Sequence, residues 1–330
     1  MAGMNAGGAS GKHFLAWIAN LTLPRSPITG SFLKMLNSIC CLLTVKNQVP
    51  PRRMRLKIGV MAWAFTIYLL CHIPAVWSFD LQLPQTAYQG DLIVGKSEPM
   101  AEIWVKKSRL RAGPQGYFVL PVPRNQKTDI GITARHKGES RSHVVRIWAF
   151  PWRTQNIKGL PKQYVTPSAE QQRKVVSDLQ KVRKIRNDPP YPVPFFIKKG
   201  FKKPVKGSVT SPFGLNRILN GKPKQFHSGV DFAAPLGHPV YSPADGIVRL
   251  IDPDMFLMGK TLIMDHGLGV TSIYIHLNDI LVATGDLVRQ GELIARVGKT
   301  GRATGAHLHW GINVGPTPVD PLRLLNRPFP

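Results

Sequence analysis

Gly305-Ala306-His307-Leu308-His309-Trp310 sets two histidines two positions apart in a mostly apolar stretch. Because residues i and i+2 of a β-strand point to the same face, both imidazoles are expected to enter one cavity side by side. Burying two such polar rings costs free energy unless a metal ion or a reaction uses them. The rest of the chain must indicate which of these two uses applies.

A second pair of candidate ligands lies in His227-Ser228-Gly229-Val230-Asp231. Gly229, and the Ala-Ala-Pro segment at 233–235, argue against a helix, so we expect a strand end or a turn here. With one histidine of the His307/His309 pair, the two residues offer three nitrogen and oxygen donors. Three protein ligands and an open position for water are the pattern of a catalytic zinc site, whereas a closed structural site would need four.

The charge of the chain is strongly positive and unevenly distributed. The 330 residues include 44 basic and 18 acidic ones, a formal net charge of +26. Residues 1–78 hold eight of the basic residues and no acidic one, which leaves +18 for residues 79–330. Such a surface attracts a polyanion, that is, nucleic acid, an acidic lipid surface or an anionic cell-wall polymer.

Residues 54–78 have the layout of a signal peptide or membrane anchor. The basic segment 52–57 precedes the 14 apolar residues 58–71, and Val76 and Ser78 occupy the −3 and −1 positions for cleavage before residue 79. The uncharged run 58–78 is also long enough to span a bilayer, so an uncleaved anchor at the inner membrane is the alternative. Both alternatives predict export to the cell envelope or periplasm.

The remaining features of the N-terminal region limit the metal chemistry. Residues 1–53 are a leader of uncertain status, either a genuine cytoplasmic segment or sequence upstream of a start at Met54. All three cysteines, Cys40, Cys41 and Cys71, precede residue 79. A mature protein beginning there would contain no thiol, so a metal ion would have to take histidine and carboxylate ligands.

Residues 79–150 are predicted to form a small antiparallel β-domain. Its five β-rich runs are separated by glycine and proline turns and lie at 91–94, 102–105, 116–120, 130–133 and 144–148. His136 and His143 lack ligand spacing and are expected to be ordinary surface residues. A docking, substrate-guiding or autoinhibitory role is the most that this segment supports.

Residues 151–206 are predicted to be a helical and basic linker. Ser168 and Gln171 fit a capping box, helical spacing continues to Asn187, and Asp188-Pro189-Pro190 should end the helix. The basic residues on its other face are expected to be solvated. Residues 191–206 mix prolines, aromatics and lysines, which indicates an exposed connection to the last domain.

Residues 207–322 resemble the lysostaphin-type (LytM-like) zinc metallopeptidases, which cleave peptidoglycan peptides. The similarity begins with His227-x-x-x-Asp231 and His307-x-His309 and extends to further motifs in the order of that family. These are Ser211–Gly214, Asp231–Val240, Pro243–Val248, Tyr274–Leu277, Gly285–Gly291 and Val297–Gly301. The resemblance implies that one zinc ion is held by His227, Asp231 and His309. It implies further that His276 and His307 handle protons.

The expected fold is therefore mainly β, with a C-terminal LytM-like antiparallel β catalytic domain at 207–330. Its core strands are expected at 240–241, 247–251, 261–265, 270–276, 293–297 and 307–314. His266 and His238 are expected to be structural or exposed, and Asp245 to be a turn residue.

The chemistry agrees with that division of roles. No His-Glu-x-x-His is present, so no glutamate stands ready as a general base. A histidine near the metal can take a proton and later return it, because its pKa lies near working pH. Whether His276 or His307 is the base stays open at this point.

The predicted function is a zinc-dependent endopeptidase acting on peptidoglycan stem peptides, with a D,D cross-link favoured over a glycine bridge. The alternative is a non-catalytic wall-binding scaffold or an activator of other wall hydrolases. A biotinyl- or lipoyl-type carrier would need a lysine at a hairpin tip, which the 285–294 segment lacks. A nucleic-acid partner conflicts with the export signal, and no aromatic-basic RNA motif is present. The sequence leaves the oligomeric state open.

Overall fold

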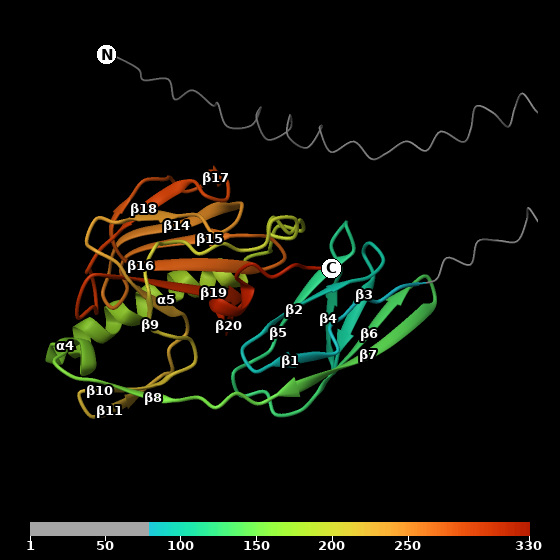
Figure 1. The fold of residues 1–330 in the computed structure, drawn as a ribbon, viewed down its shortest axis with the longest axis horizontal. Coiled ribbons are helices and arrows are strands. Elements are labelled where there is room, and N and C mark those ends of the chain that lie inside the picture. The colour runs from blue at the N-terminus through green and yellow to red at the C-terminus, as the bar shows by residue number, and fades with distance from the viewer. Residues whose placement is uncertain (1–78) are drawn as a thin grey trace, which may run out of the picture. The chain divides into compact units, whose positions relative to one another are not determined.

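The computed structural model describes residues 79–330 (Figure 1). The expected leader, the signal peptide or anchor, and all three cysteines lie outside these residues. Among the helices of residues 79–330, none has the length and apolar character needed to cross a membrane.

The fold is mainly β, as expected. The N-terminal part contains a five-stranded sheet in the order β1-β7-β6-β3-β4 and a separate β2-β5 pair. All pairings in it are antiparallel except β1 with β7, which is parallel. The strands are β1 (Thr86–Tyr88), β2 (Leu92–Lys96), β3 (Glu102–Val105), β4 (Ser108–Arg111), β5 (Tyr117–Pro121), β6 (Ile130–His136) and β7 (Glu139–Trp148).

The alternation of buried and exposed side chains along its strands explains the hydrophobic core of the N-terminal part. In β6 the side chains of Ile130, Ile132 and Ala134 are buried, while the positions between them are exposed or half-buried. This period of two is what a sheet with one covered face requires. The predicted β-rich runs correspond to β2, β3, β5, β6 and β7, and β7 begins five residues earlier than predicted because it extends into a long hairpin with β6.

The C-terminal part is built on a ten-stranded sheet whose main path is β17-β14-β15-β16-β19-β12-β9, with β13, β18 and β20 attached to it. Its strands are β9 (Val209–Ser211), β12 (Val230–Ala233), β13 (Pro239–Tyr241), β14 (Gly246–Met255), β15 (Gly259–Asp265), β16 (Val270–Ile280), β17 (Leu287–Val288), β18 (Leu293–Val297), β19 (His307–Val314) and β20 (Thr317–Val319). A short 3-10 helix, η2 (Pro321–Leu324), follows.

The centre of this sheet is covered on both faces. Six consecutive residues of β19, Leu308–Ile312 among them, are buried, and so are the first five of β16. Trp310 and Tyr274 are the largest fully buried side chains and occupy paired positions on the two strands. The six predicted core strands are therefore confirmed, most of them with longer ends.

A third sheet joins the middle of the chain to the C-terminal part. Its order is β11-β10-β8, from β8 (Thr154–Ile157), β10 (Asn216–Leu219) and β11 (Lys222–Lys224). β8 pairs with β10 in parallel, and β10 pairs with β11 in a hairpin. A segment predicted to be a linker thus contributes a strand to the hairpin that precedes His227.

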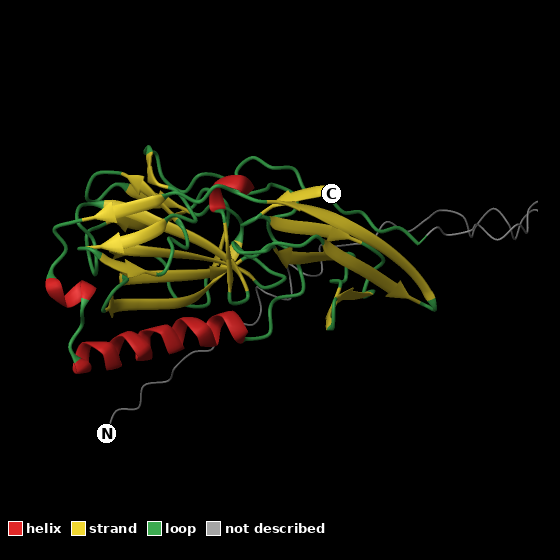
Figure 2. Ribbon diagram, turned by 90° about the horizontal axis from the view of Figure 1, so that it is seen from below, coloured by secondary structure: helices red, strands yellow, loops and turns green. Residues whose placement is uncertain are grey.

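Two helices follow β8, α4 (Lys162–Val165) and α5 (Ala169–Asn187). The predicted capping box is confirmed, because Ser168 and Gln171 bond to each other's backbone N–H, and the helix ends at Asp188. Figure 2 shows α5 along one side of the strands. Its basic face is only partly solvated, since Lys181 lies 2.6 Å from Asp252 of β14.

The expectation of an exposed connection at 191–206 is wrong. Phe196 and Phe201 are fully buried and stack with ring centroids 5.2 Å apart. They belong to one hydrophobic core with Trp310 of β19 and with Leu92 of the N-terminal part. The lysines between them remain exposed, so the mixed composition reflects a segment with one face in the core and one in water.

Candidate metal and catalytic centre

The pairing of β12 with β19 brings two of the predicted ligands together. In this antiparallel pair Asp231 lies opposite His309, and Ala233 lies opposite His307. Side chains of directly opposed residues on one face come within about 5 Å at their Cβ atoms. His309 Nδ1 lies 2.7 Å from Asp231 Oδ1 as a result.

His227 reaches the same point from the turn before β12. Its Nε2 atom lies 2.9 Å from His309 Nδ1 and 3.0 Å from Asp231 Oδ1. Gly229 makes this approach possible, because a Cβ atom there would stand 2.5 Å from the Trp310 carbonyl oxygen and 2.7 Å from His309 Nε2. The glycine that argued against a helix is thus needed for the close packing of the turn on β19.

The three atoms fit a small divalent cation. His227, Asp231 and His309 are all buried and form the group of potential metal ligands found within residues 79–330. Zinc holds nitrogen and oxygen ligands at about 2.0–2.2 Å in a tetrahedron, whose edges are then about 3.3 Å. The observed separations of 2.7–3.0 Å need to widen by only a few tenths of an ångström. Two imidazole nitrogens and one hard carboxylate oxygen in a buried cluster suit zinc chemistry.

The outer contacts of His227 fix its tautomer. His227 Nδ1 donates to the Pro212 carbonyl oxygen at 2.9 Å and lies 3.2 Å from Ser211 Oγ. The proton therefore sits on Nδ1, and the lone pair of Nε2 points to the ligand cluster. Such outer hydrogen bonds orient a ligand and raise its basicity.

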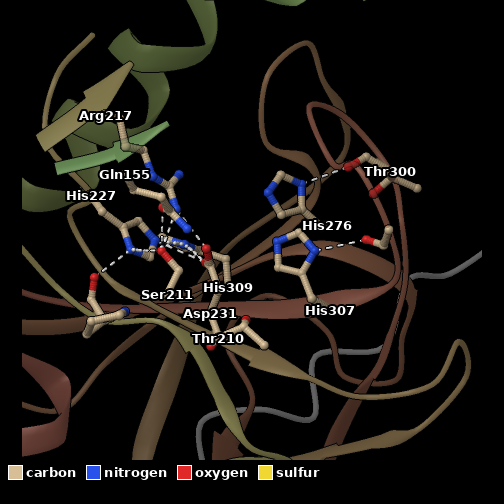
Figure 3. A network of polar contacts seen from close by, with 12 residues as sticks. Gln155, Thr210, Ser211, Arg217, His227, Asp231, His276, Thr300, His307 and His309 are labelled. Carbon is tan, nitrogen blue, oxygen red and sulfur yellow. Dashed lines mark hydrogen bonds and ion pairs between the residues drawn. The ribbon is translucent and has the colours of Figure 1, made fainter. Parts of the chain in front are cut away.

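Two further residues hold the cluster, and the sequence did not single them out. Arg217 Nη2 donates to Asp231 Oδ2 at 2.7 Å and to Ser211 Oγ at 3.1 Å. Ser211 Oγ in turn donates to Gln155 Oε1 at 3.0 Å, across 56 residues of sequence. Figure 3 shows Gln155, Arg217 and Ser211 gathered on the His227 side of the cluster. No local motif marks Gln155 or Arg217, because they meet Ser211 only through the β8–β10 and β9–β12 pairings.

His276 and His307 form a second group beside the ligands (Figure 3). Their ring centroids are 4.9 Å apart, and that of His276 is 6.4 Å from that of His309. Each ring is held by one carbonyl oxygen, since Nδ1 of His276 donates to Thr300 at 2.7 Å and Nδ1 of His307 donates to Gly305 at 2.9 Å. Within residues 79–330 neither Nε2 atom meets a hydrogen-bond partner. Two Nε2 lone pairs are thus free for a substrate or water.

The backbone of His276 is unusual. Its φ of +63° lies in the left-handed region, which a residue with a side chain rarely adopts. Its N–H donates to the Met258 carbonyl oxygen at 2.9 Å, which stabilises this conformation. Strain of this kind persists where the surroundings demand one orientation of a side chain.

Burial controls the ionisation of the centre. Burial lowers the pKa of His309 to about 4 and, with the charges of His307 and His309, that of His276 to about 3. Both rings are therefore neutral at pH 7, the form in which imidazole binds metals or accepts protons. Burial would raise the pKa of Asp231, but hydrogen bonds to His227 and His309 outweigh it and hold that pKa well below its usual range.

The remaining histidines of residues 79–330 lie outside this centre. His266 is fully buried, with Nδ1 donating to the Asp245 carbonyl oxygen at 2.8 Å and Nε2 2.7 Å from Ser272 Oγ, so it is structural. His136, His143 and His238 are half-buried and join no ligand cluster among the described residues. Asp245 accepts from the backbone of Gln290, in keeping with a turn role.

Comparison with known proteins gives a consistent result. Residues 225–321 match the model of Peptidase family M23. The chain is 43% identical over 97 residues to peptidoglycan DD-endopeptidase ShyB of Vibrio cholerae, a match that covers 29% of this chain and 22% of that protein. It is 39% identical over 116 residues to DD-carboxypeptidase/endopeptidase Mpg of Neisseria meningitidis, covering 34% and 26%. The chain thus spans about a quarter of the length of these curated relatives.

A solved structure resembles a larger part of the chain. A protein from Pseudomonas aeruginosa described as a peptidase M23 superposes with a TM-score of 0.56 at 27% identity, over 72% of this chain and 94% of that one. The likeness therefore extends beyond the matched family region into the residues before it. The fold around the ligand cluster is that of an M23 peptidase domain.

Proposed function

We propose that this chain, which carries a peptidase family M23 domain at residues 225–321, is a zinc-dependent endopeptidase that hydrolyses peptide cross-links of peptidoglycan. The observation that carries the proposal is the geometry of the centre. Three buried ligand atoms converge within 3.0 Å of one another, and His276 and His307 stand beside them with Nε2 atoms that have no partner among residues 79–330.

In this proposal His227, Asp231 and His309 hold one zinc ion. When bound, zinc supplies an activated water and a Lewis acid for the scissile carbonyl. Asp231 contributes the single negative charge of the ligand set, and Arg217 keeps that carboxylate oriented through Oδ2, which would leave Oδ1, beside His227 and His309, to hold the metal.

His276 and His307 move the protons. A neutral imidazole with a free Nε2 can accept the proton of the attacking water and deliver it to the leaving amine. The carbonyl oxygens of Thr300 and Gly305 keep Nδ1 protonated in both rings, so that only Nε2 is available.

The substrate assignment rests on the relatives and on charge. Two relatives are named for activity on D,D bonds, and ShyB is named for peptidoglycan. We propose the same D,D-type bond between stem peptides here. Residues 79–330 carry a net charge of +18, which suits an enzyme held on an anionic cell wall. Export to the periplasm, with cleavage or retention of the 54–78 segment, belongs to the same proposal.

Digestion of purified sacculi by residues 79–330 tests this function. We expect soluble muropeptides whose masses show hydrolysed D,D cross-links, and no release in the presence of a chelator. His143→Ala, at a histidine far from the centre, is the matched control and should retain activity. Chelator-insensitive release, or full activity in His309→Ala, would contradict the proposal. Binding to sacculi without any release would favour the alternative of a scaffold or activator.

A further inference from the structure

The loop between β18 and β19 holds both proton-handling histidines and carries a cation between its two contact points. Thr300 bonds to His276, and Gly305 bonds to His307, each through its carbonyl oxygen. Arg302 lies between these two residues, and its backbone N–H donates to the Leu257 carbonyl oxygen at 2.9 Å. The backbone of Arg302 is thereby fixed at the edge of the catalytic centre.

The guanidinium of Arg302 has no partner in the described part of the chain. It is half-buried, yet it makes no ion pair and no side-chain hydrogen bond with residues 79–330. A guanidinium presents five N–H donors and stays ionised, so a half-buried one without a protein acceptor is available to an anionic ligand. Arginines held in this way are commonly matched by a ligand that supplies the acceptors.

A second guanidinium, that of Arg217, belongs to the ligand cluster itself. Burial lowers the pKa of Arg302, and the positive charge of Arg217 lowers it further. Arg217 is already paired with Asp231, and its Nε atom is buried without a partner among residues 79–330. Arg217 therefore neutralises the one carboxylate of the ligand cluster, whereas Arg302 has no such counter-charge among residues 79–330. The centre has an excess of positive charge even before a metal ion adds to it.

We propose that Arg302, in the loop that holds His276 and His307, forms a subsite that binds a free carboxylate of the peptide substrate next to the scissile bond. This inference rests on the proposed function, because it deepens the substrate class of the same centre. A carboxylate suits the site because its two oxygens match the planar fork of a guanidinium, and because it would neutralise the excess charge. An uncharged peptide of the same length would leave that charge uncompensated.

A matched pair of cross-linked peptides tests the subsite. The two peptides are identical, except that one carries a free carboxylate next to the scissile bond and the other carries a carboxamide there. We expect wild type to favour the carboxylate by about tenfold to hundredfold in kcat/KM, the range of a hydrogen bond to a charged group. Arg302→Gln should reduce that preference to near unity.

Two control variants separate this role from loop support. Lys299→Gln removes an exposed cation from the same loop and should keep the preference of wild type. Arg302→Lys keeps the charge but lacks the planar fork, so we expect an intermediate preference. Zinc content and melting temperature, measured for each variant, verify that the centre remains assembled. An Arg302→Gln enzyme that still discriminates between the peptides would overturn the proposal.

Binding without turnover distinguishes the inference from the proposed function. Calorimetric titration of both peptides in the presence of chelator reports affinity alone. Tighter binding of the carboxylate peptide, lost in Arg302→Gln, supports the subsite even if neither peptide is cleaved. Cleavage of both peptides at equal rates would refute the subsite and leave the endopeptidase proposal intact. Equal or undetectable binding of the two peptides, without cleavage, would refute both.

Discussion

The side chains of His307 and His309 project from the same face of β19 but have different surroundings. His309 lies opposite Asp231, whose Oδ1 is 2.7 Å from its Nδ1. His307 lies opposite Ala233, which offers no side-chain donor or acceptor, and its Nδ1 turns to the Gly305 carbonyl oxygen. The cross-strand partner therefore decides which imidazole joins the ligand cluster.

Single substitutions should separate these two roles. His309→Ala is expected to abolish stoichiometric zinc binding, because two protein ligands hold the ion far more weakly than three. His307→Ala should retain about one zinc per chain and lose about 10²–10⁴ in kcat, the usual contribution of a positioned acid or base. Metal analysis by plasma emission, together with muropeptide release, measures both effects. Loss of zinc in His307→Ala would contradict the assignment.

His266 should make stability depend on pH. Burial lowers its pKa from 6.5 to about 4, so the unfolded chain binds the proton more tightly than the folded chain. The contribution of His266 to the free energy of unfolding should therefore be largest above pH 6.5. It should fall as the pH drops from 6.5 to about 4 and then level off. The predicted loss is about 3 kcal/mol, at about 1.4 kcal/mol per pH unit.

Urea unfolding at several pH values measures this effect. His266→Gln keeps a donor and an acceptor but does not titrate, so the difference between variant and wild type isolates His266 from the other histidines. The variant should show a shallower fall between pH 6.5 and 4. Parallel curves for the two proteins would show that His266 does not contribute.

At the scale of elements, β8 supplies a residue that supports the ligand cluster from outside the C-terminal sheet. Its parallel pairing with β10 sets Gln155 opposite Arg217, and Gln155 Oε1 accepts from Ser211 at 3.0 Å. Arg124, from the segment after β5, donates to the Gly214 carbonyl oxygen at 2.8 Å and to Asn216 at 2.7 Å. Residues outside the region that matches the M23 family model thus support the segment that carries His227.

Gln155→Ala should weaken zinc binding without removing a ligand. The substitution takes away the acceptor of Ser211, which contacts both Arg217 and His227. Outer contacts of this kind typically change metal affinity by about tenfold to hundredfold. Asn156→Ala, at an exposed position of the same strand, is the matched control. Competition with a chromophoric chelator gives the affinity, and equal values for the two variants would contradict this role.

At the scale of the whole described chain, a single hydrophobic core contains residues from several of the segments that the sequence analysis treated as separate. Phe196 and Phe201 of the 191–206 segment and Leu92 of β2 pack in the same cluster as Trp310. Arg323, just before the C-terminus, pairs with Asp91 at 3.1 Å. The ligand cluster therefore lies in a unit whose stability depends on residues far outside 207–330.

Excision of residues 207–330 should consequently destabilise the centre. Loss of Phe196 and Phe201 alone forfeits about 1.5–3 kcal/mol each of buried apolar surface. We expect residues 207–330 to melt at a lower temperature than residues 79–330 or to aggregate, and residues 191–330 to recover part of the difference. Thermal unfolding, monitored by circular dichroism, gives the melting temperature of each of the three polypeptides. Equal melting temperatures would show that the C-terminal sheet is self-sufficient.

The sequence by itself determined the mainly β fold, the strands at the centre and the candidate ligands His227, Asp231 and the His307/His309 pair, of which the family resemblance implied His309. It could do so because these features are local: alternation and apolar runs define β16 and β19, and the histidine spacings define the candidates. The capping box of α5 was predictable for the same reason, since its partners Ser168 and Gln171 are three residues apart.

Only the tertiary structure decided the surroundings of those residues. Gln155, Arg217 and Arg302 carry no local signal, because each reaches the centre through strand pairing or a loop fixed by distant carbonyl oxygens. The burial of Phe196 and Phe201 was missed, because a proline- and lysine-rich segment reads as exposed until its apolar face meets a core. Residue types and spacings are encoded locally, whereas charge balance and packing depend on contacts between residues that are remote in the chain.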